Sequence, residues 1–230
     1  ATVKAFKERG IKAASRVALI VDNSVEAIII LLSLWRLGAV ACPIDPRFPN
    51  QTVLVLLKKI RAQAVIIGDP KFLSGVKMDV PKIFITDLIV FDVKDSFYKD
   101  AKEMPLTVDL QQEAAVVFTS GTSAEAKAAV LTYGNLYFNA FGSNERIPLQ
   151  KDDRWLLSLP LFHVSGLGIL FRALLAGAAV VIAGQKDVGH ILSEGKATHV
   201  SMVATQLFRL INDGQLANFS KIKAILLGGG

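Results

Sequence analysis

Short apolar runs recur along the chain, and segments with helical spacing separate them. Each run is apolar throughout and rich in β-branched residues, the pattern of strands that are covered on both faces. Alternation of such strands with helices predicts an α/β fold of layered sheets with flanking helices. The expected strands lie at residues 17–21, 64–68, 82–86, 114–119, 155–159, 178–183, 198–203 and 223–228.

Helix signals fill the spaces between these runs. The clearest helix is expected over residues 23–37, where Asn23 or Ser24 can cap its start and Gly38 can end it. Two prolines and many charges indicate loops over residues 71–113, so we expect two sub-sheets joined around residues 70–113. Further helices are expected at 50–61, after a loop at 132–135, from near 165 to before Gly177, and after the strand that ends near 203.

Composition excludes several classes of protein. With 230 residues, 52% of them hydrophobic, the chain can bury the core of one large domain or two small ones, and a disordered chain is excluded. The net charge of +6 is scattered and suits an anionic small ligand or merely a solvated surface, and no pattern of nucleic-acid binding is visible. Cys42 stands alone, so we expect a small buried hydrophobe and neither an intrachain disulfide nor a zinc cluster.

No membrane segment or secretory signal is expected. A long stretch without a charged residue, 155–171, approaches spanning length, but Pro160, His163 and two glycines interrupt it. The first ten residues lack a basic start followed by a long apolar region, although a missing initiator Met leaves the true start open. We therefore expect a cytoplasmic protein that does not enter the membrane.

The most informative segment, residues 118–127, follows an apolar strand. Four hydroxyl side chains and one glycine occupy five successive positions: Thr119, Ser120, Gly121, Thr122 and Ser123. Lys127 follows and adds a positive charge. Convergent donors, a flexible backbone and a cation are what a phosphate group requires. The segment is not a Walker A loop, because Ala126 precedes Lys127, and a polar surface turn explains the pattern equally well.

A family resemblance decides between these alternatives. The stretch TSGTSAEAKAAVLTYGNL is similar to the signature TSGTTGxPKG...TH.NL of the acyl-adenylate-forming (AMP-binding) superfamily. GAVACPIDPRFP at 38–49 and SLPLFHVSGL at 158–167 resemble two further segments of that superfamily, so the resemblance covers nearly the whole chain. PLFHVSG, THVSMVATQLFRLI and ILLGGG resemble the branch that activates o-succinylbenzoate in menaquinone synthesis.

The resemblance implies an acid–thiol ligase that is longer than this chain. Residues 1–230 would be an incomplete N-terminal AMP-binding region, with the mobile C-terminal domain absent. The implied reaction converts a small carboxylic acid and ATP into an acyl-adenylate, which coenzyme A then converts into a thioester, with Mg²⁺ on the phosphates. We expect the fragment alone to be inactive. The partners would be the acid, ATP and CoA, with no nucleic acid or membrane, and a homo-oligomer stays open.

The resemblance also assigns the candidate site residues. The phosphates would be bound by Thr119, Ser120, Gly121, Thr122, Ser123 and Lys127, with Thr122 also contacting Mg²⁺. Lys127 and His163 would be the catalytic residues, and His163 would align the carboxylate. The acyl group would contact His163, Ser165, Arg172, Ser201, Thr205, Gly228, Gly229 and Gly230, with Arg172 suited to a second carboxylate.

Simpler interpretations of the same residues stay open. His163 could be an interior or loop residue, Arg172 a side chain at a helix rim, and Thr205 a helix cap. In place of the family's Gly, Pro and Gly the chain has Ala124, Ala126 and Ala128, which indicates a modified loop geometry or reduced activity. The alternatives are another acyl-CoA ligase or adenylation domain, or a non-catalytic paralogue that binds a nucleotide or acyl group.

Overall fold

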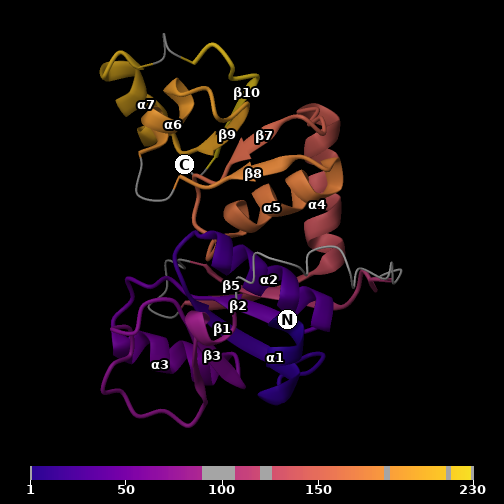
Figure 1. Ribbon diagram of the computed structural model, residues 1–230, viewed down its shortest axis with the longest axis vertical. Helices are drawn as coiled ribbons and strands as arrows, with labels where there is room; N and C mark the ends of the chain where they lie inside the picture. Colours follow the sequence, from indigo (N-terminus) through magenta and orange to yellow (C-terminus); the bar gives the residue numbers. More distant parts are fainter. Residues whose placement is uncertain (1, 90–106, 120–125, 184–186, 216–218, 229–230) are drawn as a thin grey trace. The chain divides into compact units, whose positions relative to one another are not determined.

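The structure is a computed structural model that describes residues 2–89, 107–119, 126–183, 187–215 and 219–228. It divides into two compact units, Ala1–Gly134 and Asn135–Gly230, each with its own sheet (Figure 1).

The first unit is built on a six-stranded sheet with the order β4-β3-β1-β2-β5-β6. Neighbouring strands are parallel except β5 and β6, which form an antiparallel pair at one edge. Its strands are β1 (Arg16–Ile20), β2 (Val40–Pro43), β3 (Ala64–Ile67), β4 (Lys82–Phe84), β5 (Glu113–Thr119) and β6 (Lys127–Thr132). Its helices are α1 (Thr2–Glu8), α2 (Val25–Leu37), α3 (Asn50–Lys59) and the 3₁₀-helix η1 (Ile85–Asp87).

Both faces of this sheet are buried. Ala18 and Ile20 of β1 belong to a core cluster that also contains Leu56 and Leu57 of α3. Because side chains alternate along a strand, Val17 and Leu19 point to the opposite face, and they are buried as well. The continuous apolar runs in the sequence follow from this double coverage.

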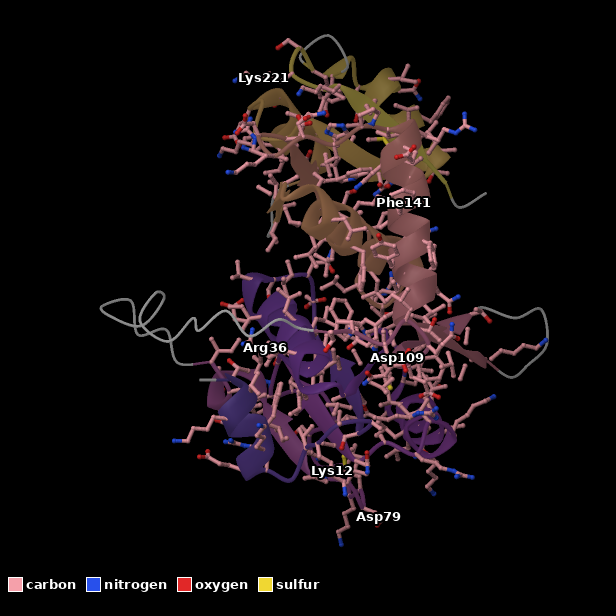
Figure 2. All side chains as sticks on the ribbon, turned by 90° about the vertical axis from the view of Figure 1, so that its right-hand side faces the viewer. Lys12, Arg36, Asp79, Asp109, Phe141 and Lys221 are labelled. Atoms are coloured by element: carbon pink, nitrogen blue, oxygen red, sulfur yellow. The ribbon has the colours of Figure 1, made fainter. Side chains whose placement is uncertain are left out.

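The second unit contains a four-stranded parallel sheet with the order β10-β9-β7-β8 (Figure 1). Its strands are β7 (Arg154–Leu156), β8 (Ala179–Val181), β9 (His199–Met202) and β10 (Ala224–Leu227). Its helices are α4 (Tyr133–Arg146), whose first two residues fall in the first unit, α5 (Val164–Ala176), α6 (Val188–Ser193) and α7 (Ala204–Asn212). Helix α4 carries exposed aromatic side chains, among them Phe141, which is 51% exposed (Figure 2).

The two faces of the second sheet differ in chemistry. Leu156, Val200 and Met202 point into an apolar cluster with residues of α6 and α7. Trp155 lies opposite His199 in the β7–β9 pair, so Trp155, His199 and Ser201 share the other face. This second face is buried but polar. It includes the candidate Ser201, and the candidate Arg172 of α5 (Val164–Ala176) contacts it through the Trp155 ring.

The α/β class and all eight expected strands are confirmed. Ser24 caps α2, since its Oγ accepts from the Ala27 N–H at 3.1 Å, and Gly38 ends the helix with a φ of 74°. Gly177 ends α5 in the same left-handed conformation, with a φ of 65°. Cys42 is fully buried, and burial raises the pKa of its thiol to about 12, so it is the inert hydrophobe that was expected.

Two sequence expectations differ from the structure. Strands on both sides of residues 70–113, β4 and β5, belong to one sheet, and the division between the units lies at Gly134 and Asn135. The expected loop at 132–135 is wrong, because β6 ends at Thr132 and α4 begins at Tyr133. The buried Tyr133 hydroxyl donates to the Trp35 carbonyl at 3.1 Å, and this tertiary bond secures the start of the helix.

Within the residues that the structure describes, every helix is too short or too polar to cross a membrane.

Candidate functional site

The expected phosphate loop joins β5 to β6. Thr119, the last residue of β5, lies opposite Lys127, the first residue of β6, in an antiparallel pair. Directly opposed residues project from the same face of a sheet, with Cβ atoms about 5 Å apart. The structure therefore places Thr119 and Lys127, the two ends of the candidate loop, opposite each other with both residues exposed. Ser120, Gly121, Thr122 and Ser123 lie outside the described residues.

Two contacts fix the strand that carries Lys127. The Lys59 ammonium group on α3 donates to the carbonyl oxygen of Ala126 at 2.7 Å. Ala128 pairs with Phe118 in the ladder, and both pack against the core of the first unit. Ala128 is an ordinary strand residue without positive φ, so alanine at this position introduces no backbone strain. Ala124 lies outside the described residues.

His163 is the N-cap residue of α5 and is exposed. Its N–H donates to the Pro160 carbonyl at 3.1 Å, which closes a tight turn directly before the helix. The turn packs so closely on the first turn of α5 that a Cβ on Gly166 would lie 2.2 Å from the Pro160 oxygen. Only glycine permits this approach, and the packing fixes the place from which His163 projects. Ser165 occupies the same first turn and is half-buried.

Arg172 on α5 is a buried cation, only 8% exposed. Its guanidinium carbon lies 5.3 Å from the centre of the Trp155 ring, and its Nη2 lies 3.4 Å from the amide oxygen of Asn139. Within the described part of the chain no carboxylate forms an ion pair with it, and its Nε has no hydrogen-bond partner. Burial lowers the pKa of the Arg172 guanidinium from its ordinary value. A ligand carboxylate would supply the missing countercharge.

Ser201 on β9 is also buried, 3% exposed. Its Oγ accepts a hydrogen bond from the Trp155 indole N–H at 3.1 Å, and its carbonyl oxygen accepts one from the Ser158 hydroxyl. Arg172 and Ser201 are thus both in contact with one residue, Trp155. The sequence did not single out Trp155, which contacts both candidate residues. The one available signal was a tryptophan in the strand directly before the PLFH segment.

The remaining candidates follow the carboxyl ends of the parallel strands, where open α/β sheets bind ligands. Thr205 is exposed on the first turn of α7, after β9. It is not the helix cap, because Val203 holds that position and the Gln206 side chain accepts from the Val203 N–H at 3.0 Å. Gly228 follows β10, and its N–H donates to the Met202 carbonyl at 3.2 Å. Gly229 and Gly230 lie outside the described residues.

The amino ends of the same strands carry a different polar cluster. Asp153, 1% exposed, lies 2.7 Å from the ammonium group of Lys223 and accepts from the Gln150 N–H at 2.9 Å. Burial opposes ionisation of Asp153, but the bonds from Lys223, Gln150 and Thr198 keep its pKa below the ordinary value. Burial lowers the pKa of His199, whose Nδ1 lies 2.9 Å from the Thr198 hydroxyl oxygen. The contacts among these groups link the segments directly before β7, β9 and β10 to one another.

One cavity of the first unit, about 230 Å³ in volume, lies near the end of α2. None of the candidate site residues borders it. Among the described residues no group of three or more His, Cys, Asp or Glu side chains could hold a metal ion, and Thr122, the candidate for Mg²⁺, lies outside them.

Several candidate residues follow the strands of the second sheet, and Lys127 begins the second strand of the β5–β6 hairpin. A known family has these features. The family model of the AMP-binding enzymes matches residues 3–230, and the chain belongs to this family. Among curated relatives, the 2-succinylbenzoate–CoA ligase of Bacillus pumilus is 28% identical over 97% of this chain and 45% of its own length. That of Enterococcus faecalis is 30% identical over 94% of this chain and 44% of its own length.

Solved structures agree with these sequence relatives. A variant of E. coli MenE with bound OSB-AMS is 30% identical, with a TM-score of 0.82 over all of this chain and 47% of that one. The o-succinylbenzoate CoA synthetase of Bacillus subtilis is 25% identical and has been solved with the acyl-adenylate intermediate OSB-AMP, with a TM-score of 0.82 and 46% of that chain covered. The chain spans about half the length of the curated relatives it matches.

Proposed function

We propose that the protein carrying these residues is an o-succinylbenzoate–CoA ligase that acts in menaquinone synthesis. The proposal depends on Arg172, a buried guanidinium group of α5 without an acidic partner among the described residues. Arg172 contacts Trp155, which also contacts Ser201. An uncompensated buried charge is unfavourable unless a ligand neutralises it. o-Succinylbenzoate has two carboxylates, so one can react while the other binds Arg172.

The reaction would have two steps. An oxygen of the substrate carboxylate attacks the α-phosphate of ATP, which forms the acyl-adenylate and releases pyrophosphate. The CoA thiol then attacks the acyl carbon, loses its proton, and displaces AMP. The relatives support this scheme, since the Bacillus subtilis enzyme was solved with ATP and a magnesium ion and with OSB-AMP.

The residues of this chain would act by positioning and by neutralising charge. Lys127, with Thr119, Ser120, Gly121, Thr122 and Ser123, would bind the phosphates. His163, exposed at the start of α5, would align the reacting carboxylate. Ser165, Ser201, Thr205 and the glycines from Gly228 to Gly230 would border the acyl group.

The hydroxyl-rich loop with its lysine has the donors that suit a nucleotide bound with Mg²⁺, and Thr122 would contact the ion. When bound, Mg²⁺ neutralises charge on the phosphate oxygens. We also propose that the protein works in the cytoplasm, where ATP and CoA are available as its co-substrates. We also predict that the protein has no nucleic-acid or membrane partner, and that it can form a homo-oligomer.

Pyrophosphate exchange tests the first step. The full-length protein that carries these 230 residues is incubated with ATP, Mg²⁺, labelled pyrophosphate and either o-succinylbenzoate or benzoylpropionate, which lacks the ring carboxylate. We expect exchange with o-succinylbenzoate and weaker exchange with the analogue, followed by thioester formation when CoA is added. Equal exchange with unrelated acids would favour another acyl-CoA ligase, and no exchange with any acid would favour a non-catalytic binding protein.

A second assay addresses the 230 residues alone. We expect no AMP and no CoA thioester from them, because the relatives are about twice as long. Formation of both products would contradict this expectation.

A further inference from the structure

Trp155 contacts both polar residues of the proposed acyl site. Its indole N–H donates to the Ser201 Oγ at 3.1 Å, and its ring lies under the guanidinium group of Arg172 at 5.3 Å. The side chain itself is 1% exposed, against 3% for Ser201 and 8% for Arg172, so it offers a ligand less surface than either of its two partners. We therefore expect its influence on a ligand to pass through Ser201 and Arg172.

The bond from Trp155 determines which role the Ser201 hydroxyl can play. A hydroxyl group has one donor and two acceptor positions. The indole N–H can only donate, so it occupies an acceptor position of Ser201 and leaves the hydroxyl hydrogen available. Among the described residues no bond from this hydrogen is found. Ser201 is therefore prepared to donate to an oxygen atom of a ligand.

The ring of Trp155 has a corresponding effect on Arg172. A cation over an aromatic face is attracted by the ring without being neutralised. The ring and the Asn139 amide oxygen hold the guanidinium group in place, while its charge stays uncompensated by any carboxylate of the described residues. A carboxylate in the place of Trp155 would neutralise the charge and compete with an acidic ligand.

We propose that Trp155 is a positioning residue that prepares Ser201 as a donor and Arg172 as an uncompensated cation, and so selects a dicarboxylate substrate. The inference rests on the proposed function and adds a residue that determines specificity. It identifies the tryptophan before the PLFH segment as the element that links the two recognition groups.

Trp155→Phe separates the two effects, because phenylalanine keeps a ring but lacks the N–H group. In the full-length protein we expect the KM for o-succinylbenzoate to rise about three- to tenfold, the range of one net hydrogen bond, with kcat changed by less than about twofold. Trp155→Leu also removes the ring, so we expect a larger rise in KM for o-succinylbenzoate than for benzoylpropionate.

A double-mutant cycle asks whether Trp155 acts through Ser201. We expect Trp155→Phe to have little further effect on KM in a Ser201→Ala background, because its partner is already absent. If Trp155 had a purely structural role, Trp155→Phe would lower thermal stability in both backgrounds. The rise in KM in the double variant would then be the product of the rises in the two single variants.

Trp35→Phe is the matched control. Trp35, the other tryptophan of the chain, is also buried and donates its indole N–H to the Ala114 carbonyl at 2.9 Å, but it lies in the first unit. We expect a similar loss of thermal stability with an unchanged KM for the acid.

The outcomes separate this inference from the proposed function. No thioester from the wild-type protein overturns both. If the wild type forms thioester, two results overturn the role of Trp155 alone. One is an unchanged KM in Trp155→Phe, and the other is a double variant whose rise in KM is the product of the two single rises. The role of Trp155 is supported if Trp155→Phe raises KM in the wild-type background and causes no further rise in the Ser201→Ala background.

Discussion

The buried position of Arg172 is unfavourable for stability and suits the carboxylate binding that we propose for it. It is 8% exposed, and its Nε finds no hydrogen-bond partner. Buried charges are usually compensated by carboxylates, and removing an uncompensated one relieves the penalty of desolvation. Its contacts to Trp155 and Asn139 offset only part of that penalty.

We therefore expect Arg172→Met to leave stability unchanged or to raise it by up to about 2 kcal/mol, while the KM for o-succinylbenzoate rises strongly. Chemical denaturation measures the first effect and steady-state kinetics the second. Leu170→Ala, a truncation of a buried side chain on the same helix, is the contrasting variant and should cost about 2–5 kcal/mol. A large loss of stability in Arg172→Met would show that the guanidinium group is fully compensated in the free protein.

His199 should make the second unit sensitive to mild acid. Burial lowers its pKa, so the unfolded chain takes up a proton at a higher pH than the folded one. The contribution of neutral His199 to the free energy of unfolding is fully present above about pH 6.5, the pKa of histidine in the unfolded chain. It is lost as the pH falls through the pKa of His199 in the folded protein. Asp153, whose pKa is also lowered, adds a further loss below about pH 4.

His199→Gln should flatten the dependence of Tm on pH between about 6.5 and 5. A curve that stays steep in His199→Gln would assign the acid sensitivity to other groups.

The residues of the candidate site were only partly predictable. Sequence resemblance identified His163, Arg172 and Ser201 as candidates, and the structure places Arg172 and Ser201 around one tryptophan. Trp155 was not predicted, because a large apolar residue in a strand reads as core, and the partner of its N–H is 46 residues away in sequence. Tertiary contacts of this kind leave no local pattern.

At the scale of elements, the start of α5 depends on one close approach. A Cβ on Gly166 would lie 2.2 Å from the Pro160 oxygen, so Gly166→Ala must displace either the turn or the helix. We expect a loss of about 1–3 kcal/mol, and a loss of turnover because His163 moves with the turn. Denaturation and steady-state kinetics on the full-length protein measure the two effects.

Gly142→Ala is the matched control within α4, where a Cβ would meet nothing within 4 Å. It should stabilise the protein by about 0.5–1 kcal/mol, since alanine favours a helix over glycine. Equal stability changes in the two variants would mean that the turn before α5 adapts to a side chain.

The strength of local signals decided which elements could be predicted. Eight strands had apolar runs or β-branched residues, and α2 had both caps. The strand β2 was missed because its four residues include a cysteine and a proline, and β6 because it is an edge strand that starts with lysine and is only half-buried. The six-residue helix α6 is too short to show a period.

At the scale of the whole molecule, each unit has its own sheet and its own apolar cluster. The expected division around residues 70–113 relied on prolines and charges. Such residues mark loops, but they do not indicate whether the next strand returns to the same sheet. Strand β5 does return, pairing with β2 through Ala41 and Ala115, so the local signal was insufficient.

The two tryptophans allow the units to be followed separately, since Trp35 lies in the first and Trp155 in the second. In Trp35→Phe the fluorescence reports the second unit, and in Trp155→Phe the first. We expect the urea midpoint of the second unit to fall more between pH 7 and pH 5 than that of the first, because His199 lies in the second. Equal shifts would mean that the units unfold as one cooperative body.

The pairing of Thr119 with Lys127 has a consequence for how the segment between them can vary. Side chains alternate along a strand, so a shift of the β5–β6 register by one residue would turn the ammonium group to the opposite surface. Exchanges of one residue for another, such as alanine for glycine, do not by themselves shift this register. A change in the segment between Thr119 and Lys127 therefore keeps the ammonium group on this surface only where it leaves the register of β5 and β6 unchanged.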